Sequence, residues 1–466
     1  MKFMIIAPPN DLDATNNEST SYDNRITPLD IAYIGAVLEG SHQVRILDAL
    51  ALALNKNQII DEIAKFNPDI ICLTAFDRCR WGIDSSNKLV RLIKNKKRII
   101  GLIWTYNSDL LSEILENNKD YDFAVFGDPE FTLLDVANKK SFRDIKGLVY
   151  RNKDKVIKNK PRELIKDLDE LPFPARHLLD LQIYKRMPHE SLIEPNFDIA
   201  VTRGCPFNCT FCLLKVTSGK NRRTRSPEKA VEEVEILKRM GARQVHFQDP
   251  VLTLNKEWSE KFCNLLIEKN FGVIWSCQTR VDCIDEKLLK LMKKAGCRSI
   301  LYGIESLDQN ILDNIKKGVK VEDIIRIIKI TKQIGIETRC SLMLGLPGET
   351  KESFEAILDK LIKLSPAFAQ FHATVAFPGT ELFENFDKFG RLAEDKHVKK
   401  FDLTGKPFIP NGYNNEQEIL ATQRHAYKKF YIRPFFVLKK IFNFKDIERN
   451  IRGIKIILKL QRNSDR

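Results

Sequence analysis

Short apolar runs alternate with longer amphipathic stretches along most of this chain, and this alternation restricts the fold more than any other feature. In the first third, stretches of helical periodicity separate five such runs: 2–7, 44–48, 69–74, 98–104 and 123–127. Apolar strands with helices between them are typical of a parallel, doubly wound α/β sheet. A further pair of short runs within 147–158 predicts a hairpin.

A second alternating series follows a proline-containing linker at 168–176. It contains six apolar runs: 198–202, 244–248, 273–278, 299–303, 337–344 and 369–376. Six strand–helix units in sequence predict a complete or partial parallel barrel, in which the chemistry collects on the loops after the strands. We therefore predict an α/β fold with four regions: a Rossmann-like doubly wound domain at 1–165, a linker at 166–194, a partial (β/α)6 barrel at 195–400 and a helical, basic C-terminal region at 401–466.

The excess of positive charge is located mainly at the end of the chain. The 466 residues carry a formal net charge of +14, and 428–466 alone has 12 Lys and Arg against 3 acidic residues. A nucleic-acid-binding domain usually shows basic residues throughout, so we expect no nucleic-acid partner. No apolar run is long enough to span a membrane, and the apolar start is too short for a signal peptide. We therefore expect a cytoplasmic protein with reduced cysteines.

Three cysteines stand close together directly after the first strand of the second series. Cys205, Cys209 and Cys212 have the spacing C-x3-C-x2-C. Three thiolates on one loop can hold three corners of an iron–sulfur cube. No fourth cysteine follows nearby, so one iron would be open to a substrate or cofactor. A structural zinc site is the alternative, although zinc sites favour four ligands in paired spacings.

This cysteine loop resembles that of the radical SAM superfamily. The resemblance covers about 195–380 and includes four further segments: 247–253, 275–282, 300–306 and 344–350. It implies that a [4Fe–4S] cluster on the three cysteines binds S-adenosylmethionine (SAM) at its open iron. Electron transfer would then cleave SAM to a 5′-deoxyadenosyl radical. The resemblance also implies that Phe211, the aromatic residue before the last cysteine, lies near the adenine.

The same resemblance implies SAM contacts at the ends of later strands. Asp249 would be a cofactor contact, with Gln248 in place of the acidic residue usual before it. Glu305 would accept hydrogen bonds from the ribose hydroxyls, and Arg280 would bind the methionine carboxylate as a fork. The alternatives are that Glu305 is a solvated loop residue and that Arg280 pairs with Asp282 or Glu305.

Two glycines and three further cysteines complete this set. Gly345 and Gly348 would let the backbone approach SAM, or would serve only as turn residues. Cys277, Cys297 and Cys340 lack cluster spacing. We expect these cysteines to be buried small residues, not ligands of a second cluster.

The first domain resembles the cobalamin-binding domain of cobalamin-dependent radical SAM proteins. Four segments carry this resemblance: 7–9, 28–39, 44–48 and 126–130. It implies a cobalamin at the carboxyl ends of the strands, with Thr74 and Gly101 as contacts. Leu50 stands where D-x-H-x-x-G proteins have a cobalt-ligating histidine, and Leu102 replaces the second glycine of a pair. The alternative is therefore a retained domain that binds no ligand.

The basic end of the chain has its own amphipathic pattern. Apolar residues recur at helical spacing over 446–460, with Lys and Arg between them. Such a helix could lie on the inner face of an anionic membrane or near a lipid substrate. The alternative is a helix that packs on the barrel with its basic face in solvent.

Together these features predict a radical SAM enzyme that acts on an unactivated carbon of a small-molecule or lipid substrate. By resemblance, cobalamin-dependent methyl transfer is the commonest outcome, with flavodoxin or ferredoxin as a low-potential electron donor. A radical oxidoreductase, cyclase or rearrangement enzyme with a vestigial cobalamin domain is the alternative. An iron–sulfur or cobalamin sensor is the non-enzyme alternative. A methylthiotransferase is disfavoured because the sequence shows no second cysteine triad.

Overall fold

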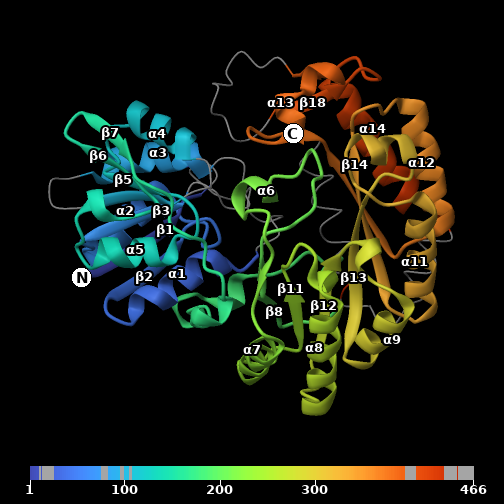
Figure 1. The fold of residues 1–466 in the computed structure, drawn as a ribbon, viewed down its shortest axis with the longest axis horizontal. Helices are drawn as coiled ribbons and strands as arrows, with labels where there is room; N and C mark the ends of the chain where they lie inside the picture. The colour runs from blue at the N-terminus through green and yellow to red at the C-terminus, as the bar shows by residue number, and fades with distance from the viewer. Residues whose placement is uncertain are drawn as a thin grey trace. The chain divides into compact units, whose positions relative to one another are not determined.

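The computed structural model describes residues 1–9, 12, 26–74, 82–94, 99–103, 108–393, 406–434 and 449. The chain divides into two compact units, which Figure 1 shows as a ribbon. The N-terminal unit comprises 1–185 and 216–219, and the C-terminal unit comprises 186–215 and 220–466.

The N-terminal unit is built on a seven-stranded sheet of order β2-β1-β3-β4-β5-β6-β7. The strands are β1 (Lys2–Ala7), β2 (Gln43–Asp48), β3 (Ile70–Thr74), β4 (Ile99–Ile103), β5 (Phe123–Val125), β6 (Leu148–Asn152) and β7 (Lys155–Lys158). The first five strands are parallel, and β6 and β7 form the predicted hairpin, which extends the sheet in antiparallel fashion. The change of direction at β1 makes this a doubly wound sheet, as the sequence predicted.

Helices cover both faces of this sheet because the right-handed crossovers run in opposite directions, from β1 out to β2 and then from β2 back to β3, β4 and β5. They are α1 (Leu29–Glu39), α2 (Lys56–Phe66), α3 (Gly82–Ile93), α4 (Ser108–Asn117) and α5 (Glu130–Ala137). The central strands are buried on both faces, since Phe3 and Ile5 on one face and Met4 and Ile6 on the other are all 0% exposed. This burial explains why the strand reads as a continuous apolar run.

The C-terminal unit contains a six-stranded, all-parallel sheet whose strands follow chain order, β8-β11-β12-β13-β14-β15. The strands are β8 (Asn196–Ile199), β11 (Gln244–Phe247), β12 (Ile274–Thr279), β13 (Cys297–Glu305), β14 (Glu337–Leu344) and β15 (Phe368–Ala373). The main helices are α7 (Pro227–Arg239), α8 (Lys256–Lys269), α9 (Glu286–Lys294), α11 (Val321–Gln333), α12 (Lys351–Leu364) and α14 (Glu416–Tyr431).

Shorter elements lie in the loops of the C-terminal unit, and one of them, at Leu214–Thr217, has its last two residues in the N-terminal unit. They are β9 (Thr202–Arg203), α6 (Leu214–Thr217), β10 (Arg223–Thr224), α10 (Gln309–Asn314), β16 (Val375–Ala376), α13 (Glu381–Glu384), β17 (Gly390–Leu392) and β18 (Lys406–Pro410). In Figure 1 the long helices α8, α9, α11 and α12 run along the sheet.

The two faces of the six-stranded sheet differ in burial. All its crossovers run in one direction, so the helices gather on one face. Ile300, Tyr302 and Leu342 belong to the large apolar core and are 0% exposed. Leu301 and Gly303, which alternate with them along β13, are only half-buried. The face opposite the helices therefore remains accessible to a ligand.

Helix α14 covers the edge of this sheet beside β15. The Tyr431 hydroxyl accepts a hydrogen bond from the Ala369 nitrogen at 3.0 Å and donates to the Ala369 oxygen at 2.7 Å. The Tyr427 hydroxyl accepts from the Phe371 nitrogen at 3.2 Å. These side chains satisfy backbone groups that an edge strand would otherwise leave unpaired.

The predicted helix at 446–460 lies outside the described residues, apart from Arg449. Among the helices that the structure describes, none combines the length and the apolar composition needed to cross a bilayer.

Candidate functional site

The cysteine loop begins where the first strand of the parallel sheet ends. After β8, the short strand β9 leads to Gly204, whose φ of +82° turns the chain in a way that favours glycine. Within the loop, the Thr210 nitrogen donates to the Ile315 oxygen at 3.0 Å, and the Thr210 oxygen accepts from the Leu382 nitrogen at 2.9 Å. The loop is therefore fixed to two later segments of the same unit.

The three thiols suit an iron–sulfur cluster. Cys205, Cys209 and Cys212 are free and half-buried. Burial raises the pKa of Cys212 to about 11. It also raises the pKa of Cys209, against the nearby charges of Lys317 and Arg280. No three His, Cys, Asp or Glu side chains of the described part of the chain converge on a point that could hold one metal ion. A cube differs from such a site because each thiolate binds its own iron.

Arg280 lies directly after β12 and contacts the cysteine loop. Its guanidinium forks the Asp282 carboxylate at 2.9 and 2.8 Å and donates to the Lys317 oxygen at 2.6 Å. Its Nη1 lies 3.7 Å from the Cys209 sulfur. Of the alternatives that the sequence left open, pairing with Asp282, only two residues away, is the one in this structure. A contact of Arg280 with the SAM carboxylate stays a prediction.

A buried ion pair lies at the end of β13. Lys317 Nζ donates to Glu305 Oε1 at 2.8 Å, and the two side chains are 6% and 10% exposed. Glu305 has a φ of +59°, which is rare for a residue other than glycine and typical of functional sites. A Cβ on Gly303 would stand 2.8 Å from Glu305 Oε1, so the bare backbone of β13 makes room for the pair.

Lys317 is the site residue that sequence reasoning missed. The sequence pattern indicates a solvated basic turn at Lys316, Lys317 and Gly318. The only signal in the sequence is its position, because it lies in the loop that follows Glu305 and α10. Nothing local to that turn indicates that Lys317 folds back into the unit.

Asp249 follows β11 and is fully buried. Its Oδ1 accepts hydrogen bonds from the backbone nitrogens of Val201 and Thr202 at 2.9 and 2.5 Å, so it fixes the chain just before the cysteines. Its Oδ2 has no hydrogen-bond partner among the described residues. Burial raises the pKa of Asp249 to about 6, against these hydrogen bonds. One buried acceptor therefore remains for a ligand.

The loop after β14 has the positive φ angles that its glycines allow. Gly345 and Gly348 have φ of +75° and +87°, which agrees with a turn role for both residues. The Gly345 nitrogen donates to Oε1 of the buried Glu349 at 2.7 Å, which fixes the loop. Phe211 lies against two apolar clusters of this unit and is half-buried.

The remaining strand cysteines of this unit are structural. Cys277, Cys297 and Cys340 are each 0% exposed, as the sequence predicted. Burial raises the pKa of Cys340 far above its ordinary value, so this thiol stays protonated at neutral pH.

Glu349 predicts a pH dependence of stability. Burial raises its pKa to about 8, against the hydrogen bonds from Gly345 and Tyr413. The folded state holds this proton more tightly than the unfolded state, whose pKa is near 4.5. The stabilisation is complete below about pH 4.5 and is lost as the pH rises to about 8. Glu349→Gln should remove this loss.

The test compares thermal midpoints of the parent protein and Glu349→Gln at several pH values between 5 and 9. The midpoint of the parent should fall relative to that of the variant as the pH rises. A difference between the two proteins that stays constant with pH would contradict the protonation of Glu349.

In the N-terminal unit, one predicted cofactor contact has an unsatisfied group. Thr74 ends β3 and is 4% exposed, and its hydroxyl has no hydrogen-bond partner among the described residues. Its carbonyl oxygen accepts from the Ser86 hydroxyl at 2.9 Å. An unpaired buried hydroxyl at the carboxyl edge of a doubly wound sheet fits a ligand contact.

The other predicted contact has a packing role. A Cβ on Gly101 would stand 2.2 Å from the ring of Phe123, so glycine is required there by the core. Leu102 is fully buried and Leu50 is half-buried. Residues 10–11, 13–25, 75–81 and 104–107 lie outside the described residues. The fit to a corrinoid therefore depends on Thr74.

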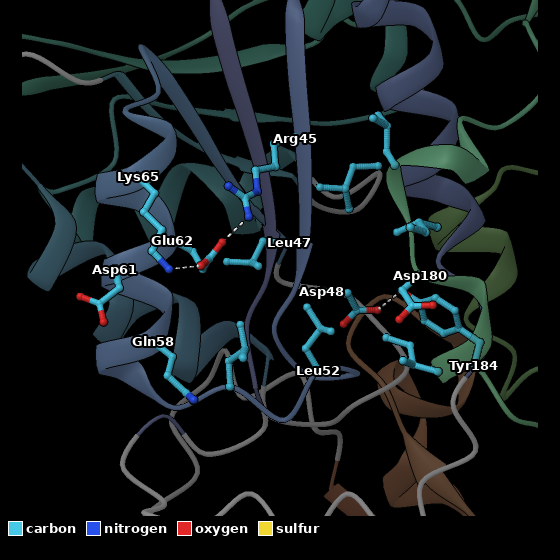
Figure 2. Close-up of a pocket in the computed structure, with 15 residues that line it drawn as sticks. Arg45, Leu47, Asp48, Leu52, Gln58, Asp61, Glu62, Lys65, Asp180 and Tyr184 are labelled. Atoms are coloured by element: carbon cyan, nitrogen blue, oxygen red, sulfur yellow. Dashed lines mark hydrogen bonds and ion pairs between the residues drawn. The ribbon is translucent and has the colours of Figure 1, made fainter.

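A cavity of about 450 Å³ lies beside the edge strand β2 of this unit. Figure 2 shows Arg45, Glu62 and Lys65 on one side and Asp48 with Tyr184 on the other. The Tyr184 hydroxyl donates to Asp48 Oδ2 at 3.0 Å, which holds the loop after β2. The cavity lies at the outer edge of β2, whereas the sheet changes direction between β1 and β3, where ligands of doubly wound sheets usually bind.

A cysteine loop with C-x3-C-x2-C spacing at the carboxyl end of a parallel βα sheet defines a class of iron–sulfur enzyme. Comparison with known proteins identifies the family: residues 199–361 match the model of the radical SAM superfamily. The chain belongs to this superfamily and is an enzyme that uses a [4Fe–4S] cluster and SAM.

Relatives support this assignment over the whole chain. It is 31% identical to a protein named uncharacterized methyltransferase PH0819 from Pyrococcus horikoshii, and the match covers 97% of this chain and 98% of the relative. It is 26% identical to the anaerobic magnesium-protoporphyrin IX monomethyl ester cyclase of Rubrivivax gelatinosus, over 93% and 79%.

Solved structures share the fold at lower identity. The radical SAM methyltransferase TsrM from Kitasatospora setae matches with a TM-score of 0.70 and 15% identity, over 91% of this chain and 89% of that chain. The cobalamin-dependent SAM radical enzyme OxsB matches with a TM-score of 0.74 and 15% identity, over 97% and 72%. The two-unit α/β architecture is therefore that of known radical SAM proteins.

Proposed function

We propose that this radical SAM enzyme carries out cobalamin-dependent methyl transfer to a carbon atom of a small-molecule substrate. The observation that carries the proposal is the buried Thr74 hydroxyl at the edge of a doubly wound sheet, which has no hydrogen-bond partner in the part of the chain that the structure describes. The cysteine loop lies in the same chain. The name of the relative from Pyrococcus horikoshii and the cobalamin bound in the structures of TsrM and OxsB support it.

The C-terminal unit would hold the cluster and SAM. Cys205, Cys209 and Cys212 would ligate three irons, and the bound cluster supplies the electron that cleaves SAM. Asp249 Oδ2, which has no hydrogen-bond partner among the described residues, is an acceptor suited to the SAM ammonium group. Lys317 would bind the SAM carboxylate, a role for which Arg280 has no free fork.

The remaining predicted contacts would orient the nucleoside. Glu305 has one oxygen on Lys317 and would use the other for the ribose hydroxyls. Phe211 would contact the adenine, and the backbone at Gly345 and Gly348 would approach SAM closely. Each of these side chains lies on a loop or strand end of one parallel sheet, where such sites form.

The finer architecture and the partners belong to the same proposal. The six-stranded unit would be a partial barrel over 195–400, between a cobalamin-type domain at 1–165 with its linker at 166–194 and a helical region at 401–466. The protein would act in the cytoplasm and receive electrons from flavodoxin or ferredoxin. The basic segment after 434 would allow peripheral contact with a membrane or access to a lipid substrate.

Anaerobic reconstitution with dithionite and SAM tests the radical chemistry. We expect 5′-deoxyadenosine and methionine to form, and S-adenosylhomocysteine to accumulate if SAM also serves as a methyl source. An intact cluster that yields neither 5′-deoxyadenosine nor methionine would refute the radical function. Formation of 5′-deoxyadenosine by protein that binds no corrinoid would favour the alternative, a radical oxidoreductase, cyclase or rearrangement enzyme with a vestigial cobalamin domain.

Thr74→Val tests the cobalamin site. The substitution keeps the shape of the side chain but removes the hydroxyl, so it should weaken binding of hydroxocobalamin by about 1 kcal/mol, or roughly fivefold. Affinity is measured by titration of the corrinoid absorbance after exchange into cobalamin-free buffer. Thr74→Ser retains the hydroxyl and is the matched control, which should bind nearly as well as the parent. Equal affinity of all three proteins would remove Thr74 from the site.

A further inference from the structure

Arg280 is almost entirely committed to contacts that surround the cysteine loop. A guanidinium has five N–H donors. Nε and Nη2 donate to the two oxygens of Asp282, and Nη2 also donates to the Lys317 oxygen. Nη1 donates to the Cys209 sulfur, which leaves a single N–H, also on Nη1, without a partner among the described residues. The free part of the group therefore faces the cysteine.

The surroundings of Arg280 place its positive charge beside the cysteine loop and its carboxylate partner nearer solvent. Its side chain is 5% exposed, whereas that of Asp282 is 32% exposed. The guanidinium carbon lies 3.6 Å from the centre of the Phe207 ring, within the cysteine loop itself. The carboxylate thus lies on the side nearer solvent, and the positive charge lies next to the thiol in a protected environment, where charges interact more strongly.

We infer that Arg280 is a positioning residue that sets the reduction potential of the cluster, an inference that rests on the cluster site of the proposed function. One-electron reduction adds a negative charge to the cluster without forming or breaking a bond. A fixed cation that donates an N–H to a cluster thiolate stabilises the reduced form, because charge and hydrogen bonds to sulfur are main determinants of cluster potential. Arg280 would thereby determine how readily the cluster accepts the electron that it later passes to SAM.

Three variants separate charge from packing. Arg280→Gln removes the charge, Arg280→Lys keeps it without the fork, and Asp282→Asn removes the carboxylate that partly neutralises Arg280. Each protein is reconstituted with iron and sulfide, and its cluster is titrated with dithionite in the absence of SAM. The midpoint potential is read from the electron paramagnetic resonance signal of the reduced cluster.

We expect Arg280→Gln to lower the equilibrium constant for one-electron reduction of the cluster about tenfold. This change corresponds to a shift of the midpoint potential by roughly −59 mV. Asp282→Asn should shift the potential in the opposite direction, and Arg280→Lys should lie closer to the parent than Arg280→Gln does. Phe207→Leu is the control for packing, since it removes the stacked ring and leaves the charge. This variant should lose part of its iron, while the clusters that remain keep a midpoint potential close to that of the parent.

The outcomes separate this inference from the proposed function. Equal potentials for the parent, Arg280→Gln and Asp282→Asn would overturn the inference while the radical function stands. A parent protein that forms no cluster would overturn the proposed function first. If Arg280→Gln holds no cluster, the sign of the Asp282→Asn shift decides: a shift to higher potential supports the inference, and no shift or a lower potential overturns it.

Discussion

Cys209→Ala is expected to abolish both the cluster and SAM cleavage. Cys209 is one of three thiols on a loop fixed to Ile315 and Leu382, and Arg280 lies 3.7 Å from its sulfur. Apart from Cys205 and Cys212, no cysteine of the described residues lies on this loop, and a cluster needs all three thiolates. We expect the formation of 5′-deoxyadenosine to fall at least a hundredfold, which corresponds to about 3 kcal/mol or more of barrier.

The measurements are iron content, the absorbance of the reconstituted cluster and the rate of 5′-deoxyadenosine formation under dithionite. Cys340→Ala is the matched control, because Cys340 is a fully buried thiol on β14 that does not lie on the loop. It should retain iron and activity at a cost of about 1 kcal/mol in unfolding free energy. A Cys209→Ala protein that keeps full iron content and activity would exclude the loop as the cluster site.

The architecture could be predicted from the sequence because solvent exclusion determines it. A strand buried on both faces must be apolar almost throughout, so β3 was located to within one residue of where the structure has it, Ile70–Thr74. The cysteines were found for a similar reason, since their spacing on one loop is itself the chemical signal. Both features depend on residues that are near one another in the sequence.

Features that depend on distant contacts were not predictable. Gly101 was singled out only as a cobalamin contact, and no local pattern showed that the ring of Phe123 on the next strand also requires a glycine there. The sequence offered three acceptors for Arg280: the SAM carboxylate, Asp282 and Glu305. Only the fold shows that the guanidinium makes its paired hydrogen bonds with Asp282. The choice among partners is made by geometry that no local pattern records.

Lys317 and Glu305 form the second site at which we expect a large effect. The two side chains are 6% and 10% exposed and their charged atoms lie 2.8 Å apart. Removing one member of a buried pair leaves the other charge without compensation, which costs roughly 3–5 kcal/mol. Lys317→Met should therefore lower the unfolding free energy by about that amount. It should also weaken SAM binding, because the proposed partner of the SAM carboxylate is lost.

A double-mutant cycle distinguishes the pair from two independent residues. Glu305→Gln combined with Lys317→Met removes both charges. The double variant should therefore lose less unfolding free energy than the two single variants lose together, by roughly 1–3 kcal/mol. Denaturant unfolding of the four proteins without cofactors measures this coupling, and SAM affinity is measured separately on the reconstituted proteins. Additive losses of stability would show that the ion pair contributes nothing as a unit. Restored stability without restored SAM binding is the result expected if Lys317 and Glu305 both stabilise the fold and bind the cofactor.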